Sequence, residues 1–128
     1  MSFEEVAVRN RTFDYAGTLY ESDGTTEISL AATDVIRVKV WRRNASTPDI
    51  EIDDSATGNG SVTTFTAGTG DYTLRIAQGD TSGLLPGVYG IEIAVVDDSE
   101  TAPANAIKHV EQGLLHITEA PAGDVGLT

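Results

Sequence analysis

Few residues of this 128-residue chain could do acid–base or nucleophilic chemistry. The two histidines, His109 and His116, both lie on a stretch whose alternation predicts a β-strand. A hydrolytic triad would need one of them beside a serine and an acid, but the strand–turn–helix serine motif of a nucleophile elbow does not occur. Because histidines on strands more often pack or face solvent, the sequence predicts that the protein is not an enzyme.

Metal binding has little more support in the sequence. The chain has no cysteine, and two separate histidines do not make the clustered ligands of a zinc site. Calcium needs several oxygen ligands converging from loops, and acids gather at Asp53 and Asp54 and at residues 97–100. Neither group has the ligand spacing of an EF-hand loop. No cofactor is therefore predicted, and calcium stays the alternative.

The most suggestive constellation surrounds the single tryptophan. Alternation over residues 35–43 turns Ile36, Val38 and Val40 inward. The outward set is then Arg37, Lys39, Trp41 and Arg43. An exposed ring between cations could anchor a protein interface or stack on a sugar ring. The structural alternative, which we favour, is that neighbouring side chains cover Trp41. Of the functional interpretations, a protein interface is better supported, because sugar platforms usually show more than one aromatic residue.

The same segment is predicted to open a hairpin. After residues 44–48 comes a second alternating stretch, residues 49–53, with its two isoleucines inward. Symmetric closure of the loop pairs Arg43 with Asp49, Trp41 with Glu51, and Lys39 with Asp53. Opposite charges facing each other across strands contribute about 0.2–1 kcal/mol each.

The stretch around which the chain is organised covers residues 79–97. Pro86 presets φ for the first central position of a type II turn, and Gly87 accepts the positive φ that follows. An alternating strand begins directly after this corner. Tyr89, near its start, is placed as in the tyrosine corner of immunoglobulin-like sandwiches, with its ring in the core and its hydroxyl bonded back to the corner's backbone.

The remaining chain reads as short strands between turn signals about 8–12 residues apart, with no convincing amphipathic helix. Residues 27–30 form one short predicted strand, and ambiguous alternation around Gly113 indicates a bulge in the last strand. The prediction is an all-β fold, an antiparallel immunoglobulin-like sandwich of about seven to nine strands. Residues 1–118 form a single domain, and residues 119–128 a flexible C-terminal tail.

Charge and hydropathy exclude several kinds of partner. The net charge of −12 argues against binding to nucleic acid or to anionic membranes. No apolar run reaches the roughly 20 residues of a membrane helix. The first residues have neither the basic front nor the apolar stretch of a signal peptide. We therefore expect a protein without a signal peptide that is made in the cytoplasm.

Three stretches carry a resemblance to a known group of proteins: residues 34–41 (DVIRVKVW), 80–93 (DTSGLLPGVYGIEI) and 113–117 (GLLHI). They resemble the small immunoglobulin-like sandwiches of tailed-bacteriophage virions, found in baseplate, tail, head-fibre and capsid-decoration proteins. The resemblance implies a non-enzymatic structural protein of the virion, made in the host cytoplasm, that acts as an adaptor, decoration or fibre-anchoring subunit. Its partners would be other virion proteins and itself, as a homo-oligomer. The alternative is a carbohydrate-binding sandwich that holds a glycan on the Trp41 face.

Overall fold

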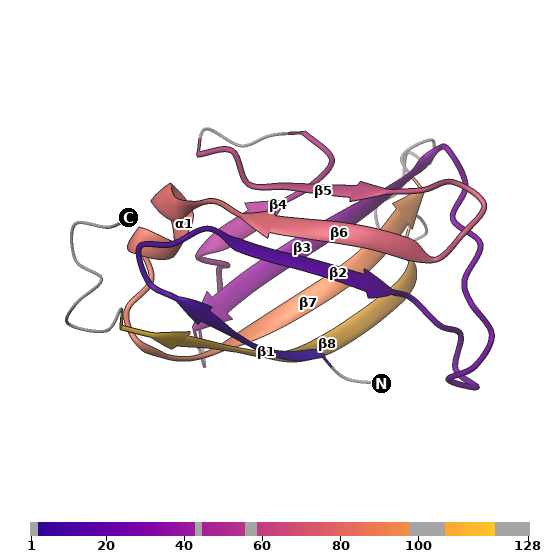
Figure 1. The fold of residues 1–128 in the computed structure, drawn as a ribbon. Coiled ribbons are helices and arrows are strands. Elements are labelled where there is room, and N and C mark those ends of the chain that lie inside the picture. The colour runs from indigo at the N-terminus through magenta and orange to yellow at the C-terminus, as the bar shows by residue number, and fades with distance from the viewer. Residues whose placement is uncertain (1–2, 43–44, 56–58, 98–106, 120–128) are drawn as a thin grey trace.

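The fold is a sandwich of two β-sheets (Figure 1). The computed structural model describes residues 3–42, 45–55, 59–97 and 107–119. Over these residues it has eight strands and one short helix. The five-stranded sheet has the order β1 (Phe3–Val8), β8 (Ile107–Thr118), β7 (Gly87–Asp97), β3 (Asp34–Arg42), β4 (Ile50–Ile52). The three-stranded sheet has the order β2 (Phe13–Thr18), β6 (Asp71–Ile76), β5 (Val62–Phe65). The predicted all-β sandwich of about seven to nine strands is confirmed.

The strand order has the immunoglobulin-like arrangement. The sheet β2-β6-β5 corresponds to strands B, E and D, and the run β8-β7-β3-β4 to G, F, C and C′. One pairing departs from the antiparallel prediction, because β1 runs parallel to β8, with Phe3 opposite Gly113 and Val8 opposite Thr118. Nearly the whole chain separates these two strands, so no hairpin forces them to run in opposite directions.

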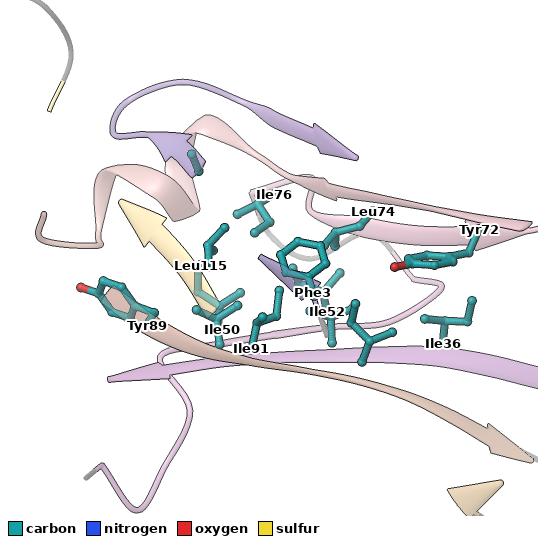
Figure 2. Packing of buried hydrophobic residues seen from close by; sticks show 14 of the residues in the cluster. Phe3, Ile36, Ile50, Ile52, Tyr72, Leu74, Ile76, Tyr89, Ile91 and Leu115 are labelled. Atoms are coloured by element: carbon teal, nitrogen blue, oxygen red, sulfur yellow. The ribbon is translucent and has the colours of Figure 1, made fainter. Parts of the chain in front are cut away.

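The core lies between the two sheets, and alternating residues of nearly every strand contribute to it (Figure 2). The alternation of β6 is regular, with Tyr72, Leu74 and Ile76 buried and the residues between them exposed. Burial of these apolar side chains is the main favourable contribution to folding. The largest fully buried side chains of the described residues are Leu19, Leu30, Ile36, Val38, Val40, Ile52, Leu74, Ile76, Ile91, Ile93, Val95 and Leu115.

Three local predictions are wrong. Residues 27–30 do not form a strand, and only a single bridge joins Glu27 to Tyr20. A helix, α1 (Gln78–Ser82), forms although no helix was predicted, because five residues are too few to show a helical period. The irregularity in β8 is not at Gly113 but near Lys108, where the register with β7 shifts between Val95 and Val96. The fully paired Gly113 breaks the apolar alternation only because it has no side chain.

The tyrosine corner is confirmed. The Tyr89 ring is buried, and its hydroxyl donates to the Leu85 carbonyl at 3.0 Å while accepting from the Leu85 amide at 2.9 Å. Gly87 has φ +147°, a conformation that side chains rarely adopt, although this angle is wider than the +80° or so of a type II turn. The corner is therefore fixed to the first core residue of β7.

Replacing Tyr89 by Phe is expected to lower the free energy of unfolding by about 1–2 kcal/mol, because the Leu85 amide and carbonyl both lose their partner. Urea unfolding of the wild type and the variant would measure the difference. An unchanged free energy would mean that water replaces the hydroxyl at no cost.

The predicted tail, residues 119–128, lies outside the described residues from residue 120 onward. Glu119 is described and forms an ion pair with Arg9 at 3.1 Å. Among the described residues, no helix is long and apolar enough to span a membrane.

Candidate protein-interaction face

The outer surface of the five-stranded sheet brings the tryptophan next to apolar side chains from distant parts of the chain. The backbone pairings place Glu4, Leu114, Gly90 and Trp41 in one row across β1, β8, β7 and β3. The next row contains Val6, His116 and Val88. On the other side lies a row of Gln112, Glu92, Lys39 and Glu51. We call the surface formed by these three rows the Trp41 face.

The Trp41 face carries much of the exposed apolar surface of the described residues. Val6 is 59% exposed, Val88 51% and Leu114 43%. All the other exposed large hydrophobic side chains of the described residues also lie on β8 or at the corner before β7, namely Leu85, Ile107 and Val110. Exposed apolar side chains gathered on one side of a molecule are typical of an interaction surface.

The outer face of the three-stranded sheet has a different character. Arg75 pairs with Asp14 at 2.8 Å, and the Thr18 hydroxyl donates to Asp71 at 2.7 Å. The hydroxyls of Thr64 and Thr73 contact each other. These side chains hydrogen-bond across strands, as expected of a sheet face in contact with water. The outer face of the three-stranded sheet is therefore polar, whereas that of the five-stranded sheet carries exposed apolar side chains.

Trp41 is half-buried because its indole ring lies over the neighbouring strand. Ring atoms Cε2, Nε1 and Cζ2 lie 3.2–3.5 Å from the position that a Cβ on Gly90 would occupy. The glycine thus leaves room for the ring to lie against the sheet. The prediction was that neighbouring side chains would cover Trp41, whereas the structure shows its ring lying over Gly90 of the next strand. The signal that could have indicated Gly90 is a lone glycine inside an otherwise alternating strand.

The predicted hairpin register is wrong by two residues. Lys39 lies opposite Glu51 and not Asp53, and Val40 lies opposite Ile50. The last backbone pair before the connection is Val40 with Ile50, so the connection is longer than the predicted five-residue loop. Within it, the Asp49 carboxylate accepts from the Arg42 amide at 3.0 Å and forms an ion pair with the Arg42 side chain at 3.6 Å. Arg43, the fourth predicted interface residue, lies outside the described residues.

Two cations on this side of the five-stranded sheet remain available to a partner: Lys39 in the Trp41 face, and Arg37 one row beyond it. Arg9, Arg42, Arg75 and Lys108 each have a carboxylate partner within ion-pair distance. Arg37 and Lys39 form no such ion pair with any described residue, although Lys39 is flanked by Glu51 and Glu92 on the neighbouring strands. Both side chains are partly exposed, so they can contact a bound partner.

The groups considered for catalysis or metal binding lie apart. His109 lies 3.4 Å from Glu111, whereas His116 lies on the other face of β8, 3.2 Å from Glu4. Within the described residues, no three His, Asp or Glu side chains gather where they could hold a metal ion. Of the two acidic groups, Asp53 and Asp54 are described, and the Asp53 carboxylate accepts from the Ser55 amide at 2.9 Å. Residues 98–100 of the other group lie outside the described residues.

A hollow of about 560 Å³ opens beside β8, lined in part by Asp34, Lys108 and His109. The buried Asp34 carboxylate accepts from Lys108 at 2.9 Å and from the Ala31 amide at 2.8 Å. The hydrogen bond to Asp34 raises the pKa of the Lys108 ammonium. Because these polar groups already satisfy one another, they support a structural role at the start of β3.

No protein-family model matches the chain, and no curated protein sequence matches it.

Proposed function

We propose that the protein is a non-enzymatic assembly subunit that binds another protein through the Trp41 face. The observation that carries this proposal is the gathering of exposed apolar side chains, from strands far apart in the sequence, on one outer face of the sandwich. Interfaces commonly have an apolar centre and a polar rim, with tryptophan and arginine among their main anchors. Here Val6, Val88, Leu114 and Trp41 form the centre.

We further propose that the assembly is a tailed-phage virion, in which the protein acts as an adaptor, decoration or fibre-anchoring subunit. This step rests on the sequence resemblance at residues 34–41, 80–93 and 113–117. The tyrosine corner and the strand order are consistent with it, since immunoglobulin-like sandwiches share both. Such a subunit would be made in the host cytoplasm and end in the particle.

Density-gradient sedimentation of particles from a lysate that contains this protein tests the proposal. The wild-type chain is expected to sediment with the particles. Leu114→Glu is expected to abolish that association, because it places a charge at the apolar centre of the interface. Ile107→Glu is the matched control, since Ile107 is 49% exposed on the same strand but outside the Trp41 face. Equal association of both variants would contradict a role for this face.

The carbohydrate-binding alternative keeps one supporting observation, the partly exposed indole ring lying against the sheet over Gly90. In that case Trp41→Ala abolishes retention on a glycan array without changing the thermal unfolding midpoint. A wild-type protein that binds no glycan on the array would eliminate this alternative.

A further inference from the structure

We infer that the occupant of the Trp41 face is a second copy of this chain. The inference rests on the proposed function, since it names the partner of the same surface. Its basis is the arrangement of the rows about β7, which lies in the middle of the five-stranded sheet. A dimer with two-fold symmetry uses the same patch on both copies, so that patch must be complementary to itself.

A two-fold axis that runs parallel to β7 and lies between the two facing sheets gives this complementarity. It places β3 of one copy over β8 of the other. Trp41 and Leu114 lie in the same row on either side of Gly90, which has no side chain. Each Trp41 ring would therefore pack on Leu114 of the second copy, and Val88 would contact its own counterpart near the axis.

The charged row is also self-complementary under this axis. Lys39 lies directly opposite Glu92 within one copy. The axis brings the two Glu92 side chains together, and the second copy brings its own Lys39 over the other side of each Glu92. Two lysines and two glutamates therefore surround the axis, and Glu51 of each copy lies at the outer edge of the row. The charges around the axis cancel, and each Glu92 has a lysine on both sides. Charge pairs of this kind fix the register of an interface more than they add affinity.

The charge of the whole chain predicts a sign for the salt dependence. The charged residues of the three rows are three acids and one base, a net charge of −2, whereas the whole chain carries −12. These residues are Glu4, Glu51, Glu92 and Lys39. The repulsion between two copies therefore comes mainly from charges outside the contact, which salt screens. Added salt should strengthen the dimer, whereas it would weaken binding to a basic partner.

The size of the face predicts a weak dimer. Five strands about 4.8 Å apart cover about 24 Å, and the stretch of β7 from Gly87 to Ile93 is also about 24 Å long. Beyond that stretch Ala94 and Val96 are already buried. The two copies together would bury about 1,200 Å², the lower limit for a stable interface, so we expect a dissociation constant in the micromolar range.

Sedimentation equilibrium of the full chain over a range of concentrations is the first test. We expect a monomer–dimer equilibrium that shifts towards dimer between 50 and 500 mM sodium chloride. Leu114→Glu should weaken dimerisation more than tenfold, and Ile107→Glu should leave it unchanged. A wild-type chain that is monomeric at millimolar concentration, or a dimer that salt dissociates, would overturn the inference.

A charge exchange tests the symmetry itself. A dimer of two Lys39→Glu chains would have four glutamates around the axis. A dimer of two Glu92→Lys chains would have four lysines there. Repulsion between these like charges should keep each variant monomeric. A mixture of the two restores two charges of each sign, and native mass spectrometry should detect the mixed dimer. Circular dichroism of each variant checks that it folds. A wild-type dimer without a mixed dimer would show that the copies meet through another surface.

Failure of this inference can be distinguished from failure of the proposed function. If the chain is monomeric but Leu114→Glu still removes it from particles, the Trp41 face binds a different protein. If Leu114→Glu changes neither dimerisation nor particle association, both proposals are wrong.

Discussion

Gly113→Ala is expected to be among the most destabilising single substitutions in this protein. A Cβ at position 113 would lie 1.9 Å from the Phe3 carbonyl oxygen, far inside van der Waals contact. The obstructing atom belongs to the backbone of β1 and cannot rotate away, so β1 must leave its place beside β8. Phe3 would then lose its burial, and removing a buried Phe side chain costs about 3–5 kcal/mol.

Urea unfolding would measure this loss for Gly113→Ala. Gly83→Ala is the control, since Gly83 has helical φ and ψ and the nearest atom to an added Cβ, the Asp80 carbonyl oxygen, lies at 3.5 Å. That variant should be neutral, or more stable by up to about 1 kcal/mol. Equal stability of the two variants would mean that β1 contributes little to the fold.

The second large effect is expected for Ser61→Ala, at about 2–3 kcal/mol. The Ser61 side chain is buried, and its hydroxyl accepts from the Ala77 amide at 2.8 Å and donates to the Asp80 carboxylate. Asp80 is also held by the Asn59 amide at 2.8 Å, so these side chains tie α1 to the segment before β5. Alanine leaves a buried amide without its acceptor, which carries the full desolvation cost.

Thermal and urea unfolding would show this loss, with Ser82→Ala as the control. The exposed Ser82 hydroxyl donates only to the Gln78 carbonyl one helical turn earlier, so its removal should change stability by less than about 0.5 kcal/mol. If Ser61→Ala is as mild as Ser82→Ala, then water fills the site and the Ala77 amide stays satisfied.

Period-two alternation was sufficient to predict the sandwich and most of its buried residues. The inward residues of β3 and β4 were identified because each of these strands has one face in the core. The corner could be predicted because Pro86, Gly87 and Tyr89 act within a few residues of one another. The parallel pairing of β1 with β8 could not, because no local feature indicates which distant strand a terminal strand will join.

The candidate site shows the same division between local and distant information. Alternation placed Arg37, Lys39 and Trp41 outward, which the structure confirms. It could not indicate that Trp41 would lie over Gly90, or that Leu114 and Val6 would lie beside it, because those neighbours depend on strand order and register. The hairpin register was missed for a similar reason, since the side-chain contacts of Asp49 determine how the loop closes.

The parallel pairing of β1 with β8 also determines how the sandwich would respond to mechanical load. Phe3 begins β1 and Thr118 ends β8, and these residues lie at opposite ends of the paired segment. A force that pulls the chain apart at these two points slides the strands past each other along their length. All the hydrogen bonds of the pair then share the load, whereas a force across an antiparallel hairpin opens its bonds one after another. The pairing of β1 with β8 is thus arranged to resist a pulling force applied between Phe3 and Thr118 along the strands.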